Sequence, residues 1–568
     1  MKRNIPIVAG AALLALSVAA CSGGSGGSAE PGAPAAQDGG SSQAASAGFQ
    51  EQHKGGTLHL QAKAGDGTLD PHINYSNGNW QVFQAMYDGL LAFKKVGGEA
   101  SYDVVPDLAQ SMPQVSKDGK SYTFTLRKGV KFAGGGEVTV DDVVASFQRI
   151  YKVSGPTSGT FYAGIVGADA CLKKPKECTL DGGVVADKAK NTVTINLVEP
   201  DSEFPLKLAL PHAAVLPKDT PAKDQGTTPI GGTGPYMAAS YDPNKELKLV
   251  RNPNFTEWSR DAQPQGYPDE ILYSYGLTAE AAVTAIQNGQ ADWVFDPLPA
   301  DRLSEIGAKY ASQAHVNQLS AFWYMPLNVN LPPFDKPEAR QALNWAIDRD
   351  AVVKMYGGAN VAQPACTLLP PGIPGHADFC DFPKPDLDKA RQLVQQSGTA
   401  GQEVSVVVSD DDVSKQIGEY VRSTLEQIGY QAKLKVISTN IHFTYIQNSK
   451  NKVQVSVSQW YADYPAASDF LHVLLSCASF RPGSDSSINI SGYCDKDVDA
   501  RMAEAMTLDR TDKNAANVKW GEIDRDLTKA SPIIPLFTPK QIDFVSSRVG
   551  NYQFHKQFFM LISQLWVK

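Results

Sequence analysis

The sequence predicts an α/β protein with mostly parallel sheets covered by helices. The order of elements in the second half of the chain supports this fold class. The apolar segment 404–408 has the length and composition of a buried strand, and 413–428 has the periodicity of an amphipathic helix. Further strands are expected at 431–437 and 453–458. Such a strand–helix–strand order is typical of parallel sheets. Because ligands of these sheets bind beyond the carboxyl ends of strands, the segment after 453–458 is the first candidate for a site.

Other elements are expected along the first half of the chain. Alternating apolar residues predict strands at 57–62, 122–126 and 192–197. Helical spacing predicts an amphipathic helix over 80–93. Thr139 is expected to cap a helix, because its hydroxyl can accept a backbone N–H and the aspartates that follow favour the positive end of the helix dipole.

Three more helices are expected, over 279–288, over 336–354 and over 387–397, where Gly398 would end the last one. The segment 336–354 is predicted as one long helix.

The chain has 568 residues, of which 42% are hydrophobic and 20% charged, which is a normal globular balance. This length corresponds to roughly three or four domain-sized units.

The N-terminus has the composition of a secretory signal. Lys2 and Arg3 precede an apolar run over 5–20, which is shorter than the roughly 20 apolar residues of a membrane span. The run ends in small residues before Cys21 and resembles the bacterial lipobox. That motif implies cleavage before Cys21 and a diacylglyceryl group on its sulfur. An ordinary signal peptide with a chance cysteine is the alternative.

The next segment, 22–53, consists almost entirely of Gly, Ser, Ala, Pro and Gln. It cannot bury enough apolar surface to order itself, which predicts a flexible tether. We therefore expect a signal peptide at 1–20 and a lipid-anchored linker at 21–54.

The formal net charge is −8, and an acidic chain without basic clusters argues against a nucleic-acid partner. The body is expected to be extracytoplasmic, held to the cell membrane by the lipid on Cys21.

The remaining cysteines form an even set, which suggests disulfides in an exported protein. Six cysteines allow 15 connectivities, and the sequential one is favoured because neighbours in the sequence then close local loops. Metal binding is the weaker alternative, since there is no Cys-x-x-Cys and the histidines do not cluster near the cysteines. The expected pairs are Cys171 with Cys178, Cys366 with Cys380, and Cys477 with Cys494.

A series of short motifs occurs in a characteristic order from about residue 55 to the end. The motifs are Leu69-Asp70-Pro71, Met86-Tyr87-Asp88-Gly89-Leu90, Val105-Pro106-Asp107-Leu108-Ala109, the stretch from Asp118 to Arg127, Gly232-Thr233-Gly234-Pro235-Tyr236, Arg251-Asn252-Pro253-Asn254-Phe255 and Ala339-Arg340-Gln341-Ala342-Leu343. Each motif alone is weak. Together they resemble the family 5 extracellular solute-binding proteins, the class that includes oligopeptide, dipeptide and nickel receptors.

The resemblance implies a two-lobe, periplasmic-binding-protein-like fold (type II, cluster C) with an extra subdomain in the first lobe. Lobe I would comprise 55–94, 211–319 and 533–568, with the extra subdomain at 95–210. Lobe II would span 320–532. The ligand would be enclosed between the lobes, which close on hinge strands.

The resemblance also points to a ligand site. The segment from Gln459 to Pro465 is similar to the family segment whose aspartate binds the α-amino group of a peptide, and by position that aspartate is Asp463. Capping of a helix is the alternative role for Asp463. Trp460, Tyr461 and Tyr464 are expected to line the pocket, with core packing as the alternative.

Two other stretches supply candidate ligand contacts. Tyr75 and Asn77 lie where the first lobe of the family edges the cleft, and they are expected to contact the ligand backbone. Trp323 or Tyr324 would face the ligand, with core packing equally open; both precede 327–330, which is expected to be a crossover strand. No basic residue is evident for a peptide C-terminus, so a longer peptide whose end is not clamped remains open.

The expected function is a binding protein, not an enzyme, that captures peptides and delivers them to the permease and ATPase of an ABC importer. It is expected to be a monomer without cofactor or metal. A sugar or a metal chelate is the alternative ligand. A secreted hydrolase is the alternative class, but the chain lacks His-Glu-x-x-His, and the G-x-S-x-G match at 23–27 falls in the tether. A further alternative is a signalling or adhesion lipoprotein that binds another protein.

Overall fold

The computed structural model describes residues 49–568 except 66 and 486. The predicted signal peptide, Cys21 and most of the predicted tether lie outside these residues. Within the described part, no helix combines the length and apolar character that a membrane crossing requires.

The first lobe is built on a five-stranded mixed sheet in the order β11-β1-β10-β9-β8. Strand β1 confirms the prediction at 57–62, and its alternating buried residues explain the pattern. It runs parallel to β10 and β11, whereas β9 is antiparallel to both β8 and β10. The elements are β1 (Thr57–Ala62), α1 (Asn77–Met86), β8 (Tyr236–Asp242), β9 (Glu246–Arg251), β10 (Glu270–Tyr275), α5 (Ala279–Gln287), β11 (Trp293–Val294) and α6 (Leu303–Lys309).

A separate four-stranded antiparallel sheet, in the order β4-β5-β7-β6, lies between β1 and β8 in the sequence. Strands β5 and β7 confirm the predictions at 122–126 and 192–197 to within one residue. Thr139 caps α2 as predicted, in a capping box with Asp142. The elements are β4 (Gln114–Val115), β5 (Ser121–Thr125), α2 (Val140–Lys152), α3 (Ala168–Lys173), β6 (Val184–Asp187), β7 (Thr192–Asn196) and α4 (Phe204–Leu208).

The second lobe contains the predicted parallel sheet, in the order β16-β15-β17. Strand β15, helix α10 and strand β16 form the expected crossover, and α10 buries the apolar side that its periodicity predicted. The elements are α7 (Pro337–Ala346), α8 (Arg349–Tyr356), α9 (Leu387–Gln396), β15 (Glu403–Ser409), α10 (Asp412–Gln427), β16 (Gln431–Ile437), α11 (Thr439–Gln447), β17 (Val455–Ser456), α12 (Ser468–Leu475), α13 (Lys496–Leu508) and α14 (Lys513–Ala530).

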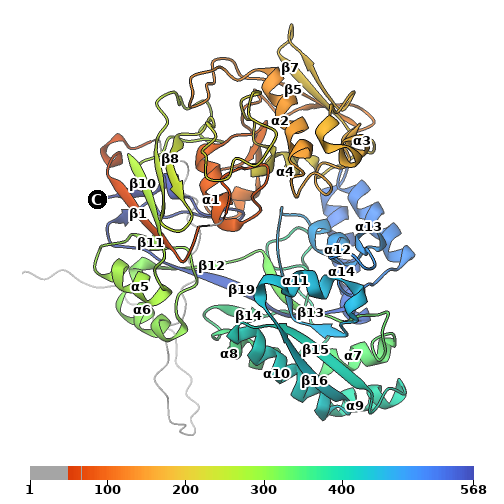
Figure 1. The fold of residues 1–568 in the computed structure, drawn as a ribbon. Helices are drawn as coiled ribbons and strands as arrows, with labels where there is room; N and C mark the ends of the chain where they lie inside the picture. Colours follow the sequence, from red (N-terminus) through yellow and green to blue (C-terminus); the bar gives the residue numbers. More distant parts are fainter. Residues whose placement is uncertain (1–48, 66, 486) are drawn as a thin grey trace, which may run out of the picture. The chain divides into compact units, whose positions relative to one another are not determined.

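The long strand β19 (Ile533–Phe544) connects the lobes (Figure 1). Its first residues pair with β13 (Ala321–Pro326), and its last residues pair with β12 (Ala314–Gln318). Strand β18 (Ser458–Tyr461) pairs with the other side of β13 and forms the edge of this sheet. The crossing between lobes therefore falls within β19 and between β12 and β13.

Two helix predictions were partly wrong. The predicted helix over 80–93 ends at Met86, and Leu91–Phe93 forms strand β2. Strand β2 pairs antiparallel with β3 (Val104–Pro106), so its buried apolar residues do not belong to one helical face. The predicted helix over 336–354 is two helices, because the Asp348 side chain accepts the backbone N–H of Ala351 and starts α8.

Two strand predictions were also displaced. The predicted strand over 453–458 is split into β17 and β18, and the second of these includes Trp460 and Tyr461. The predicted crossover strand at 327–330 is a turn after β13, in which the Asn328 side chain accepts the backbone N–H of Asn330.

All three predicted disulfides are present. Cys171 pairs with Cys178, Cys366 with Cys380 and Cys477 with Cys494. Each closes a loop of at most 17 residues, as the sequential pairing requires. The pattern is typical of proteins that fold in oxidising compartments.

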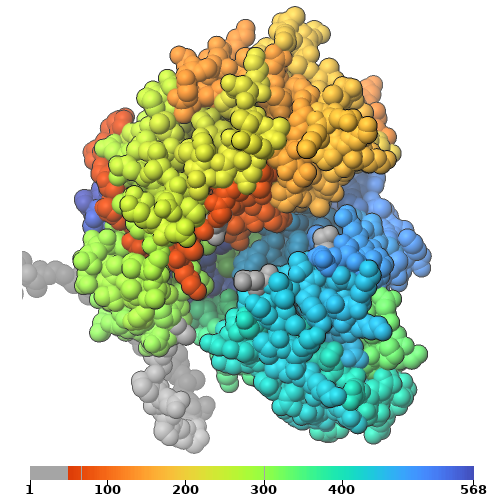
Figure 2. Space-filling view, viewed as in Figure 1, coloured from red at the N-terminus to blue at the C-terminus, as the bar shows by residue number. Residues whose placement is uncertain are grey.

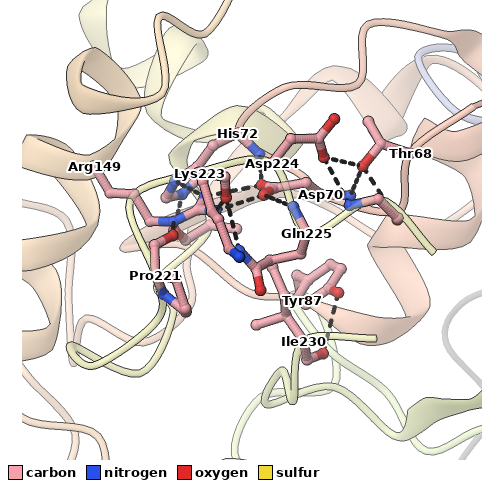
Figure 3. A network of polar contacts seen from close by, with 12 residues as sticks. Thr68, Asp70, His72, Tyr87, Arg149, Pro221, Lys223, Asp224, Gln225 and Ile230 are labelled. Atoms are coloured by element: carbon pink, nitrogen blue, oxygen red, sulfur yellow. Dashed lines mark hydrogen bonds and ion pairs between the residues drawn. The ribbon is translucent and has the colours of Figure 1, made fainter. Parts of the chain in front are cut away.

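A buried ion pair ties the chain between β1 and α1 to α2 (Figure 3). Asp70 is 0% exposed, and its carboxylate accepts hydrogen bonds from both terminal nitrogens of Arg149. The same guanidinium donates to the backbone oxygens of Pro221 and Lys223 at 2.9 Å. Burial, with the Arg149 charge beside it, lowers the pKa of His72 to about 4, so this histidine stays neutral. The cluster holds in place the chain that leads to Tyr75.

Replacing Asp70 by Asn should lower the free energy of unfolding by about 3–5 kcal/mol, because it leaves the buried guanidinium without its counter-charge. Urea unfolding followed by tryptophan fluorescence measures this loss. Glu403→Gln, which breaks the exposed pair with Lys433, is the matched control and should change stability little. Equal losses in the two variants would contradict the structural role of the buried pair.

Candidate functional site

The site begins at the edge strand β18. The register places Tyr461 opposite Ala321 and Trp460 opposite Phe322. Because side chains alternate along a strand, Trp460 and Tyr461 lie on opposite faces of the sheet. The backbone N–H of Ala462 donates to Ser320, which extends the pairing by one residue and brings Asp463 to the end of the strand.

Asp463 is held by contacts from both lobes. Its carboxylate accepts the hydroxyl of Tyr75, which precedes α1 in the first lobe. Its backbone N–H donates to Asp469 Oδ2 at 2.8 Å, and its backbone oxygen accepts the side-chain amide of Gln557 at 2.9 Å. The space-filling view shows a hollow between the red surface of the first lobe and the cyan surface of the second (Figure 2).

The charge of Asp463 is not balanced by a protein cation. In the described part of the chain, no lysine, arginine or histidine forms an ion pair with it. Burial raises its pKa to about 7, and the hydrogen bond from Tyr75 opposes this rise by stabilising the ionised form. Removal of its hydroxyl end from water, followed by the charge of Asp463, raises the pKa of Tyr75, so the hydroxyl stays a donor although part of the ring is exposed. The arrangement is an acid that a ligand cation can pair with.

The aromatic side chains around Asp463 differ in exposure. Tyr75 is 47% exposed and packs edge-on against Trp80 with ring centroids 5.5 Å apart. Tyr464 is only 4% exposed and packs edge-on against Phe161 of the first lobe at 5.8 Å. Tyr464 therefore contributes to packing between lobes, whereas Tyr75 presents its ring to the solvent.

Trp323 and Tyr461 lie diagonally on one face of the β13–β18 pair, and both are half-buried. Trp323 stacks on Phe537 at 5.3 Å and meets the edge of Tyr356 at 5.6 Å. This face offers an apolar aromatic surface, beneath which the Trp323 indole N–H is buried. Such a surface suits the side chains of a ligand.

Three other candidate residues are placed differently. Tyr324 is 2% exposed and stacks on Phe322, so core packing accounts for it. Trp460 is half-buried on the opposite face from Tyr461, where its indole N–H donates to Asp469 Oδ2 at 3.4 Å. Asn77 is half-buried at the first position of α1.

Sequence reasoning missed Asp469 and Gln557. Asp469 lies six positions after Asp463, and that spacing alone gives no reason for a contact. Gln557 comes from the C-terminal segment of the first lobe, 94 positions away from Asp463. Only the folded arrangement brings these two side chains to the backbone of Asp463.

A known protein-family model also matches more than half of this chain. The family model described as "Bacterial extracellular solute-binding proteins, family 5 Middle" matches residues 103–481. The chain belongs to this family. The two-lobe α/β fold predicted from the motifs is therefore confirmed by both the structure and the family match.

Curated relatives of this family 5 protein are similar over most of their length. The glutathione-binding protein GsiB of Salmonella typhimurium is 26% identical over 505 residues, covering 85% of this chain and 89% of the relative. The dipeptide-binding protein of Escherichia coli is 28% identical over 468 residues, covering 77% and 81%.

Solved structures show the same fold. The clavulanic acid biosynthesis oligopeptide binding protein 2 has a TM-score of 0.83 at 24% identity, covering 91% of this chain and 96% of its own. DppA of Helicobacter pylori, solved in complex with the peptide STSA, has a TM-score of 0.73 at 21% identity, covering 91% and 99%.

Replacing Tyr75 by Phe should raise the pKa of Asp463 further above its ordinary range, because the ionised carboxylate loses its hydrogen-bond donor. Carbon-detected NMR titration of the ligand-free protein measures the Asp463 midpoint. Tyr445→Phe removes an exposed hydroxyl that contacts Lys435 and is the control. An unchanged midpoint in the Tyr75 variant would show that the interlobe contact does not form in solution.

Proposed function

We propose that this protein is the extracytoplasmic binding component of an ABC-type importer and that it captures peptides between its two lobes. The observation that carries the proposal is Asp463. It is an acid at the lobe interface without a protein counter-charge, beside a donor from the other lobe. The α-amino group of a peptide is a cation that can complete this arrangement.

The physical basis of capture is a charge-assisted hydrogen bond in a closed cleft. An ammonium that binds Asp463 gains a shorter and stronger bond than a neutral donor makes. Enclosure between the lobes lowers the effective dielectric and strengthens the attraction. The ammonium also favours the ionised carboxylate, so its binding offsets the unfavourable burial of an unpaired acid.

The rest of an extended peptide has two surfaces available. Strand β18 is the edge of its sheet, so its outward backbone groups can pair with a ligand strand. The aromatic face of Trp323 and Tyr461 can take apolar side chains. Backbone pairing does not depend on ligand sequence, which suits a receptor for varied peptides. Relatives that are glutathione-, dipeptide- and oligopeptide-binding proteins support this ligand class.

Export and anchoring complete the proposal. The diacylglyceryl group on Cys21 would hold the protein at the outer face of the cell membrane, and the tether would let the body reach the permease. The protein would act as a monomer and present its ligand to the importer. The three disulfides support folding outside the cytoplasm.

Replacing Asp463 by Asn should weaken binding of a free tripeptide by about 30-fold or more, because the ammonium then lacks its ionic partner. Isothermal titration calorimetry on the protein without its tether measures this loss. Asp378→Asn, at a fully exposed acid, is the control and should bind normally. Binding of an N-acetylated tripeptide as tight as that of the free one, or binding of a sugar or chelate in place of any peptide, would contradict the proposal.

Peptide affinity should also depend on pH. The ammonium pairs with ionised Asp463, whose pKa in the ligand-free protein is about 7. Affinity is therefore full just above that pH, and it falls as pH decreases, by up to about tenfold per pH unit. Calorimetry between about pH 5 and 7.5 covers the range in which Asp463 titrates. The peptide amine is still mostly protonated over this range. The Asp463→Asn variant should show a flat profile, and a flat profile in the unmodified protein would contradict the assignment.

A further inference from the structure

Asp469 lies directly behind Asp463. It is the second residue of α12 and is 0% exposed. Its Oδ2 accepts the backbone N–H of Asp463 at 2.8 Å and the indole N–H of Trp460 at 3.4 Å. One carboxyl oxygen therefore joins the two ends of the segment that carries the ligand-binding acid. The other oxygen, Oδ1, is buried and has no hydrogen-bond partner among the described residues.

The charges around Asp469 do not balance a second anion. Lys207 is the nearby cation, but it forms its hydrogen-bonded ion pair with Asp201 at 2.7 Å. Glu203 is also buried and accepts the hydroxyl of Ser468, next to Asp469. The titratable side chains that act on Asp469 are Tyr75, Glu203, Lys207, Asp463 and Tyr464.

Burial and the neighbouring acids favour the protonated form of Asp469. Burial, followed by the negative charge of Asp463, raises its pKa well above the ordinary range. The two carboxyl groups interact electrostatically and therefore titrate as a pair, which holds one proton after the first group ionises. The group that faces the other lobe, Asp463, takes the charge, whereas the fully buried Asp469 keeps the proton.

We propose that Asp469 is a positioning residue for Asp463, and that it acts as a neutral acid that accepts two N–H groups without adding a second negative charge. This inference rests on the proposed capture of an ammonium group by Asp463. A neutral acceptor keeps Asp463 in place and leaves its ionisation to the ligand. An ionised Asp469 would instead oppose the ionisation on which capture depends.

The neutral role has a direct consequence for substitution. Asparagine has nearly the same shape as a protonated aspartic acid, and its side-chain oxygen accepts the same two N–H groups. Asp469→Asn should therefore bind a free tripeptide within about threefold of the unmodified protein. Asp469→Ala removes the acceptor and should weaken binding by about tenfold or more. Calorimetry above pH 7, with the ligand-free melting temperature of each variant recorded, measures both effects.

A second measurement needs no ligand and so separates this inference from the proposed function. Hydrogen exchange of the Asp463 amide should stay slow in Asp469→Asn and become faster in Asp469→Ala. NMR titration of the unmodified protein should show a second carboxyl that titrates above Asp463 and is missing in Asp469→Asn. If no peptide binds the unmodified protein, the proposed function fails while these readings still decide the role of Asp469.

Two results would overturn the inference. Equal weakening of binding in Asp469→Asn and Asp469→Ala would show that the negative charge, not the neutral acceptor, is required. Tight binding and slow Asp463 exchange in Asp469→Ala would show that the contact positions nothing. Rescue by asparagine alone supports the neutral positioning role, because a residue that matters only for its charge is not rescued by an uncharged amide.

Discussion

A half-buried acid at the lobe interface without a counter-charge is the constraint on which the rest of the site depends. Removing a carboxylate from water is unfavourable unless it is paired and hydrogen-bonded. The protein meets part of this cost through the Tyr75 hydroxyl and through the raised pKa of Asp463, which keeps a fraction of the acid neutral. In the proposed function, a ligand ammonium would supply the missing charge, so binding would favour the closed arrangement.

The scaffold places this acid through strands that span both lobes. Strand β19 pairs with β13 at one end and β12 at the other, and β18 is added beside β13. In the first lobe, buried Asp543 of β19 accepts the indole N–H of Trp293 and the hydroxyl of Tyr552. Such a fully bonded buried carboxylate fixes the strand where it enters the first lobe.

Local physics explains which features the sequence could predict. The Thr139 cap and the β15–α10–β16 crossover depend on residues close in the chain, so periodicity and capping rules found them. The Tyr75–Asp463 contact joins residues 388 positions apart. The strand before Asp463 pointed to its segment, whereas only the family resemblance pointed to Tyr75. Asp469 and Gln557 had no signal, because their role is to bind the backbone of Asp463, which no residue pattern encodes.

The two kinds of contact to Asp463 respond differently to movement of the lobes. Tyr75 and Asp463 belong to different lobes, so opening separates them. Asp469 and Asp463 lie on the same lobe, six residues apart, so their contact does not depend on a residue of the other lobe. The acid is therefore oriented before the ligand arrives, which lowers the entropic cost of binding. Glu203 of the first lobe also accepts the Ser468 hydroxyl at the start of α12, beside the residue that positions the acid. Contacts from the other lobe therefore add to a site whose central group is already oriented from within its own lobe.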